Sequence, residues 1–170
     1  MPKILLVDAN KCVGCRVCEL VCSAKHFKTF KRSLSGISCI KFDEVSRDIP
    51  VVCQQCEKPA CEIVCSAGAI YRDEELGALI VDYEKCVGCK KCVSACPFGA
   101  IFFDEEQKKP IKCDFCDGDP ECLKICPSEA ISYEEAEKAG LKKRREIVKE
   151  LPELMKLVEN PPVSDFTDKK

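Results

Sequence analysis

The sequence contains no tryptophan, and aromatic residues make up only 6% of its 170 residues. A core with so few large side chains buries little apolar surface, and small folds of this kind usually need disulfides or bound metals. No stretch approaches the roughly 18 consecutive apolar residues that a membrane-spanning helix requires. The sequence therefore predicts a thin core that needs cross-links, and no direct membrane span.

The beginning of the chain lacks the features of a secretory leader. The apolar run from Ile4 to Val7 is far too short for a signal-peptide core, and no twin-arginine signal precedes it. Thiols stay reduced inside cells and bind metals there, whereas disulfide frameworks belong to secreted proteins. We therefore expect a cytoplasmic protein whose cysteines bind metal.

Features of nucleic-acid-binding proteins and of common enzymes are also missing. The chain has 27 basic and 29 acidic residues, whereas a dedicated nucleic-acid-binding domain carries a basic excess. It has a single histidine, His26, no Ser–His–Asp set and no glycine-rich nucleotide fingerprint. We expect no nucleic-acid partner and no catalytic site within this chain.

Cysteine, in contrast, is abundant, with 17 residues. Sixteen of them form four motifs in the order A, B, A′, B′, and both A and A′ follow the pattern C-x2-C-x2-C-x3-C. Motifs B and B′ have a longer middle gap, and duplication of a two-motif unit explains the order most simply. The four sets are Cys12, Cys15, Cys18 and Cys22; Cys53, Cys56, Cys61 and Cys65; Cys86, Cys89, Cys92 and Cys96; and Cys113, Cys116, Cys122 and Cys126.

The spacing of these cysteines is typical of [4Fe–4S] clusters. In two-cluster ferredoxins, three closely spaced thiolates of such a run bind one cluster and the fourth binds the other. A structural zinc site instead uses four ligands from two separate knuckles, so a zinc-binding module or a disulfide framework is the disfavoured alternative. The sequence predicts four [4Fe–4S] clusters held by the sixteen cysteines.

Hydrophobic patterns predict short secondary-structure elements around the motifs. Residues 3–8, 37–42 and 79–82 are predicted strands, and the step from the third to the fourth cysteine has the spacing of one helical face. An Ala-Ile pair follows three of the motifs, and each pair is predicted to begin a strand. These pairs are Ala69-Ile70, Ala100-Ile101 and Ala130-Ile131.

The four motifs resemble the four-cluster ferredoxin-type subunits of the dimethyl-sulfoxide-reductase and formate-dehydrogenase class, over about residues 3–133. The resemblance implies an α+β fold of two bacterial-ferredoxin-like dicluster modules related by pseudo-twofold symmetry. The outer module would comprise residues 1–48 with 110–133, and the inner module residues 49–109. Residues 134–170 would form a helical C-terminal extension, which packs on its own domain or docks on a partner.

The resemblance also implies which cysteines share a cluster. In that family the pairing is nested, so that Cys126 completes the set of the first motif and Cys22 that of the last. Likewise, Cys96 completes the set of the second motif, and Cys65 that of the third. The sequence by itself leaves a sequential pairing open.

In its compact length, the chain resembles the ferredoxin subunits of tungsten aldehyde oxidoreductases or carbon-monoxide dehydrogenases. This implies a relay of electrons between a tungsten- or molybdenum-pterin catalytic subunit, with an aldehyde oxidoreductase favoured, and an acceptor such as ferredoxin. The alternatives are a relay for a carbon-monoxide dehydrogenase or a hydrogenase, or a freestanding soluble polyferredoxin. An exposed apolar patch at the C-terminal helix would favour a subunit, and a uniformly charged surface would favour a free carrier.

Two residues outside the motifs attract attention. His26 occupies the position that alanine takes after the other three motifs, and it is either a hydrogen-bond donor to a cluster sulfur or a packing residue. Cys39 is the seventeenth cysteine, and we expect it to be a small buried apolar residue rather than a redox group or ligand.

Overall fold

The computed structural model describes residues 3–43, 47–138 and 140. The chain divides into a compact unit that ends at Glu135 and a second unit that begins at Ala136. In the second unit, only residues 136–138 and 140 are described, and they are helical. The first two residues of the predicted C-terminal extension, 134 and 135, belong instead to a strand of the first unit, Ile131–Glu135. Residues 139 and 141–170 of the extension lie outside the described residues.

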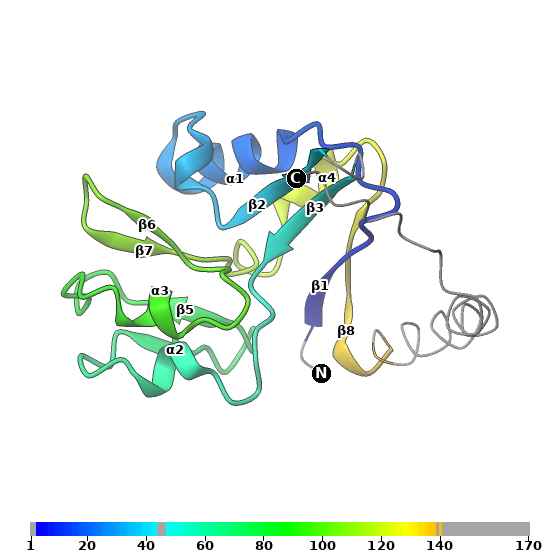
Figure 1. Cartoon of the computed structure of the whole chain (residues 1–170). Coiled ribbons are helices and arrows are strands. Elements are labelled where there is room, and N and C mark those ends of the chain that lie inside the picture. Colours follow the sequence, from blue (N-terminus) through cyan, green and yellow to red (C-terminus); the bar gives the residue numbers. More distant parts are fainter. Residues whose placement is uncertain (1–2, 44–46, 139, 141–170) are drawn as a thin grey trace, which may run out of the picture. The chain divides into compact units, whose positions relative to one another are not determined.

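The first unit consists of short strands and helices joined by tight loops (Figure 1). In chain order the elements are β1 (Lys3–Val7), α1 (Val17–Phe27), the 3-10 helix η1 (Arg32–Leu34), β2 (Ile37–Phe42), β3 (Arg47–Val52), α2 (Ala60–Ile63), β4 (Ile70–Arg72), β5 (Leu79–Val81), α3 (Lys91–Ala95), β6 (Phe102–Asp104), β7 (Lys109–Ile111), α4 (Glu121–Ile125) and β8 (Ile131–Glu135).

The predicted elements are present with small shifts of their ends. The three predicted strands correspond to β1, β2 and β5, and two of the three Ala-Ile pairs begin β4 and β8. The third pair precedes β6, which begins one residue later, at Phe102. A helix carries the third cysteine of every motif, but only α1 also includes the fourth. Helices α2, α3 and α4 end before Cys65, Cys96 and Cys126, so the predicted helical step is complete only in the first motif.

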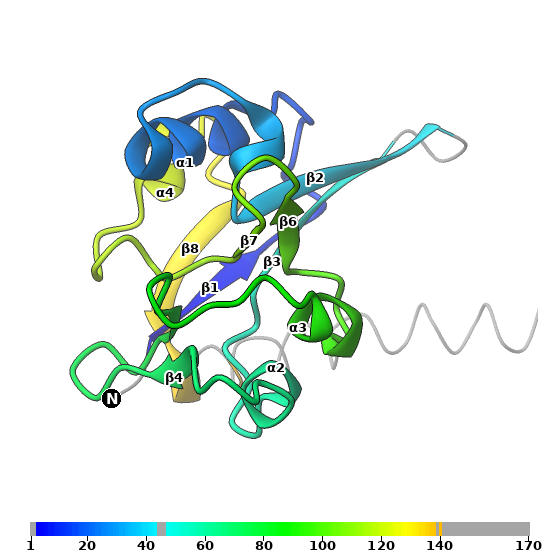
Figure 2. The same ribbon diagram turned by 90° about the vertical axis from the view of Figure 1, so that its left-hand side faces the viewer.

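The strands form antiparallel pairs, and one pair joins the two ends of the first unit. Strand β1 pairs with β8, where Leu5 lies opposite Tyr133, while β2–β3, β4–β5 and β6–β7 are local hairpins. Helix α1 packs on α4 and helix α2 on α3. Figure 2 shows α1 and α4 together beside β8, with α2 and α3 side by side in the middle region of the chain. Residues from both ends thus build one part of the unit.

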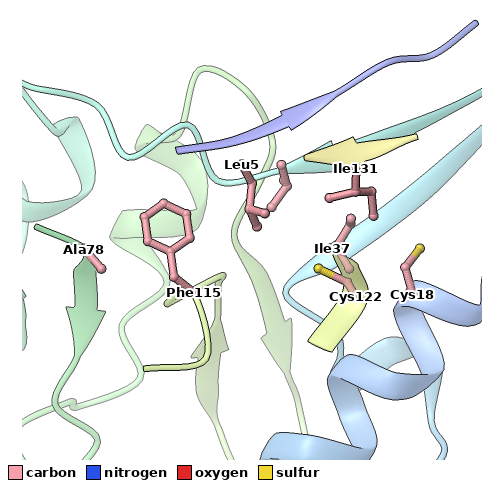
Figure 3. Close-up of a cluster of buried hydrophobic side chains, with 8 residues drawn as sticks. Leu5, Cys18, Ile37, Ala78, Phe115, Cys122 and Ile131 are labelled. Carbon is pink, nitrogen blue, oxygen red and sulfur yellow. The ribbon is translucent and has the colours of Figure 1, made fainter. Parts of the chain in front are cut away.

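Cysteine side chains are integral to the two hydrophobic cores of the described chain. The first core contains Leu5, Cys18, Ile37, Val52, Ala78, Phe115, Cys122 and Ile131 (Figure 3). The second contains Cys61, Ile70, Leu79, Cys92 and Ile101. Phe115, which is fully buried, is the largest side chain in either core. Both cores are small, as the shortage of aromatic residues predicts, so groups bound to their cysteines must contribute to stability.

A recurring turn follows three of the four motifs. The residue three positions after the last cysteine has a left-handed backbone, with φ of 60° at Gly68, 58° at Gly99 and 50° at Glu129. In each turn the amide of this residue donates a hydrogen bond to the carbonyl oxygen of the last cysteine. Glycine adopts this conformation without strain, whereas a side chain at this position is disfavoured by about 1–2 kcal/mol. The turn at Glu129 is therefore strained.

We predict opposite effects on stability at two equivalent positions of this turn. Gly99→Ala should lower the free energy of unfolding by about 1 kcal/mol, because the new Cβ meets no atom within 4 Å and only the backbone is strained. Glu129→Gly should raise it by about 0.5 kcal/mol, since the relief of strain exceeds the entropy cost of glycine. Thermal unfolding of the metal-loaded proteins under anaerobic conditions measures both. A loss of stability in Glu129→Gly would contradict the account.

Candidate metal centres

The cysteines of the first motif line a cavity together with a cysteine from the other end of the described chain. Cys12, Cys15 and Cys18 meet Cys126, which follows α4. Cys39 of β2 lines the same cavity. The first three thiols come from the loop before α1 and from its first turn. The fourth arrives because β8, which follows Cys126, pairs with β1.

Two further cavities repeat this arrangement. One is lined by the first three cysteines of the last motif, Cys113, Cys116 and Cys122, and by Cys22 of α1. The other is lined by the first three cysteines of the third motif and by Cys65 of the second. In each case three thiols of one motif meet the fourth of another, which is the nested arrangement.

For the cysteines of the second motif, the neighbouring thiols are indicated by the pKa shift of Cys61. Burial raises the pKa of the Cys61 thiol, and the nearby sulfur atoms of Cys53 and Cys96 raise it further. Cys61 and Cys96 also pack in the second hydrophobic core. Cys96, the fourth cysteine of the third motif, therefore lies near Cys61 of the second motif.

Backbone amides donate hydrogen bonds to the fourth cysteine of every motif. Three donors belong to the alanine four residues later, with N···Sγ distances of 3.3–3.4 Å at the pairs Ala69–Cys65, Ala100–Cys96 and Ala130–Cys126. At Cys22 the donor is instead Gly36, at 3.3 Å, because α1 continues to Phe27. A Cβ at Gly36 would lie 2.8 Å from the backbone nitrogen of Cys113, so this donor must be a glycine.

Burial raises the pKa of seven of the sixteen thiols. It raises the pKa of Cys18 and Cys122 to about 12, and that of Cys92 and Cys116 to about 11. Groups with such values are neutral thiols unless a cation binds them, whereas thiolates are the form that ligates iron. The cavities therefore suit positively charged metal centres that compensate four buried thiolates.

Lys112 is a buried ammonium between two of the cysteine sets. Its side chain Nζ donates hydrogen bonds to the carbonyl oxygens of Leu79 and Cys113, the latter at 2.8 Å, and the residue is 7% exposed. Burial raises the pKa of Cys61 and of Cys113, and the Lys112 charge opposes this at both thiols. No salt bridge to Lys112 occurs within the described residues. A buried unpaired charge is costly, so an anionic cluster on each side fits this site.

Contacts between neighbouring residues link the four cysteine sets in the order of the first, last, second and third motifs. Cys18 and Cys122 belong to the same core, and so do Cys61 and Cys92. The link between these two groups is electrostatic, because the neighbouring Cys53 contributes to the raised pKa of Cys113, after burial and Cys122. Gln55 reinforces this link, since its side chain donates to the Cys113 carbonyl and accepts from the Leu79 amide. The two middle sets are thus those of the second and last motifs.

His26 lies beside the set of the last motif. Its Nε2 is 3.3 Å from Cys116 Sγ and 3.5 Å from Asp114 Oδ1, and its side chain is 27% exposed. This geometry allows the imidazole to donate a hydrogen bond to the sulfur. The sequence left open whether His26 donates a hydrogen bond to a cluster sulfur or only packs. For the first alternative, the structure offers the Cys116 sulfur as the acceptor.

No sequence pattern indicated the roles of Lys112 and Gln55. A lysine precedes the first cysteine in three motifs, at Lys11, Lys85 and Lys112, yet only Lys112 is buried. The motif position therefore could not distinguish it. Cys39 is 4% exposed, which confirms that it is buried, but its place beside Cys12 was not predicted.

The gathered cysteines define the class of protein, namely a ferredoxin-type protein that holds [4Fe–4S] clusters. A family model described as a 4Fe-4S dicluster domain matches residues 46–136. The chain therefore belongs to this 4Fe-4S dicluster family and is an iron–sulfur protein. Among the described residues, no helix is both long and apolar enough to cross a bilayer.

Several relatives carry names that describe electron transfer. YsaA of Escherichia coli, whose name describes an electron transport protein, is 39% identical over 123 residues, which cover 68% of this chain and 77% of YsaA. The electron transport protein HydN of the same organism is 42% identical over 108 residues, or 59% of each protein. A selenate reductase subunit of Mesobacillus selenatarsenatis is 38% identical over 59% of this chain, and the match covers only 36% of that subunit. The chain thus spans only part of the longer relatives.

We predict that Lys112 raises the reduction potentials of the two middle clusters. Lys112→Met should lower both by on the order of 50 mV, since a unit charge about 10 Å away at an effective dielectric constant of about 20 contributes 1–2 kcal/mol. Redox titration followed by electron paramagnetic resonance measures the potentials. Lys85→Met is the matched control, because Lys85 occupies the same motif position but is exposed beside Asp82. Equal shifts in both variants would contradict the assignment.

Proposed function

We propose that this protein relays electrons through four [4Fe–4S] clusters. The observation that carries the proposal is the set of three cavities, in each of which three thiols of one motif meet the fourth thiol of another. The proposed ligand sets are Cys12, Cys15, Cys18 and Cys126; Cys113, Cys116, Cys122 and Cys22; Cys53, Cys56, Cys61 and Cys96; and Cys86, Cys89, Cys92 and Cys65.

The two hydrophobic cores support a division into two dicluster modules. The first core packs cysteines of the first and last sets, mainly with residues from both ends of the first unit, and Val52 and Ala78 join it from residues 49–109. The second core packs only cysteines of the two sets from the middle of the chain. This agrees with an outer module of residues 1–48 with 110–133 and an inner module of residues 49–109.

Each bound cluster would supply the ability to accept and release one electron. The cysteine thiolates hold the irons, and the buried thiols of the two cores keep water away from the links between sets. The amide donors at Cys22, Cys65, Cys96 and Cys126 stabilise negative charge on sulfur. Every proposed set is complete, with no open iron position for a substrate, so this chain acts as a non-catalytic subunit.

The cysteine sets at the two ends of the linked order reach the surface. Cys15 and Cys89 are the exposed cysteines of the motifs, and they belong to the first and the third motif, whose sets stand at the two ends of that order. An exposed apolar residue lies beside each of them, Val13 at 66% and Val87 at 72% exposure. Apolar contacts of this kind favour docking of protein partners. We infer that electrons enter at one end and leave at the other.

We propose that one partner is a catalytic oxidoreductase subunit with a tungsten- or molybdenum-pterin site. The names of the relatives support an oxidoreductase, since they include subunits of a selenate reductase and of an anaerobic dimethyl sulfoxide reductase. An aldehyde oxidoreductase as the partner and ferredoxin as the acceptor form the finer proposal. Co-purification of the native protein with a pterin-containing subunit tests it, and a native chain that runs alone would favour the freestanding polyferredoxin.

The cluster content is the first prediction of this proposal. Anaerobically purified protein should contain about 16 iron and about 16 acid-labile sulfide per chain, because each of four clusters has the composition Fe4S4. Elemental analysis and sulfide determination measure both. Zinc in place of iron would overturn the relay, whereas about four fewer irons would contradict the count of four.

A second prediction concerns His26, which we propose as a donor to the Cys116 sulfur. His26→Ala should lower the potential of the cluster held by Cys116, because a hydrogen bond to a thiolate stabilises the reduced cluster. His26→Gln should largely restore the potential, since an amide can still donate. Potentiometric titration of each variant decides, and an unchanged potential in His26→Ala would leave only the packing role.

A further inference from the structure

The cavity of the first motif holds one more thiol than a cluster needs. Five cysteines line it, because Cys39 of β2 joins Cys12, Cys15, Cys18 and Cys126. The Sγ atoms of Cys12 and Cys39 are 3.7 Å apart. The cavity of the third motif contains four cysteines, and that of the last motif also contains four. Among these three cavities, the surplus thiol is peculiar to the first.

An ion pair between the buried Glu19 and the half-exposed Arg32 holds the backbone of Cys39 in place. The Glu19 carboxylate is 1% exposed, and its Oε1 accepts a hydrogen bond from the Cys39 amide at 2.6 Å. Its other oxygen accepts a hydrogen bond from the Arg32 side chain. Glu19 directly follows Cys18 in α1, so the same helix that carries a proposed ligand also fixes the fifth thiol. A residue that merely filled space would not require a buried carboxylate, which is costly to desolvate.

Cys39 is buried, at 4% exposure, and its Sγ lies beside that of Cys12. Four thiolates suffice for the four irons of a cluster, so a fifth thiol can bind iron only once one of them is lost. The nearest thiolate that it could replace is that of Cys12.

We propose that Cys39 is a reserve ligand that takes over the iron of Cys12. In this exchange the bond between iron and Cys12 Sγ breaks, and a bond between the same iron and Cys39 Sγ forms. The thiol proton of Cys39 passes to the Cys12 sulfur across the 3.7 Å contact. No electron is gained or lost, and no further reactant is needed. In a Cys12→Ala variant, which lacks the Cys12 sulfur, the Cys39 thiol would release its proton to solvent and bind that iron.

The proposal rests on the assignment of Cys12 as a cluster ligand, and the test separates the two. Native mass spectrometry and iron analysis count the clusters of each variant. Cys12→Ala should retain about as much iron as the wild type, whereas Cys86→Ala should lose about four irons per chain. Cys86 is the matched control, because it occupies the same position in the duplicated motif and its cavity has no fifth thiol. The double variant Cys12→Ala/Cys39→Ala should also lose about four irons.

Each of the following results would overturn one of the two proposals. A wild-type protein without [4Fe–4S] clusters would overturn the proposed function itself. Wild-type content with equal losses in Cys12→Ala and Cys86→Ala would overturn only the reserve ligand. A Cys12→Ala protein that is insoluble while Cys86→Ala is soluble would overturn it as well.

A milder variant provides a second measurement that does not remove any proposed ligand. Cys39→Val keeps an apolar side chain in the space but removes the sulfur. If Cys39 rebinds iron, a ferrous chelator should extract one cluster several-fold faster from Cys39→Val than from the wild type, with the other clusters unaffected. Equal rates of iron loss would show that Cys39 only fills space.

Discussion

The whole structure depends on one requirement, namely that four thiols from distant parts of the chain converge on each metal centre. The aromatic-poor sequence offers no alternative source of cohesion. The cysteines are themselves core residues, and Cys18 and Cys122 pack between β1, β2 and β8 as leucines would in another protein. Pairing of β1 with β8 is the backbone counterpart of this requirement, since it brings the loop of the first motif to Cys126. Folding and metal binding are therefore coupled in this chain.

Much of this arrangement could be predicted from the sequence, because cysteine spacing is fixed by the size of the cluster rather than by the surrounding fold. The motifs, the short helices and most strand starts were predictable for this reason. The roles of Lys112, Gln55 and Cys39 were not. Each depends on a long-range contact, as with Lys112, which differs from Lys85 only in what packs around it. Local sequence patterns contain no information on such contacts. The nested pairing of the cysteine motifs could be expected only from the resemblance to a known family.

The four sets are chemically equivalent, yet their surroundings differ. The middle of the linked order contains a buried ammonium and an amide that joins two motifs, while the exposed cysteines belong to its ends. The first motif departs most from the repeat. Its helix α1 continues past Cys22, so the amide that donates to the Cys22 sulfur comes from Gly36. His26 stands at the position where the other three motifs have alanine. The duplication thus gives four similar scaffolds, and individual side chains differentiate them.

The nested convergence of the cysteines also imposes an order on biosynthesis. A ribosome delivers the chain from its N-terminus, yet the first motif cannot complete its set until Cys126 has emerged. The two inner sets are complete as soon as Cys96 is available, about thirty residues earlier. The middle of the molecule can therefore mature while its first-made segment still waits, with unsatisfied thiols, for the last. Under the proposed ligand sets, the thiols of the first motif lack their fourth partner until synthesis of the ferredoxin region is finished.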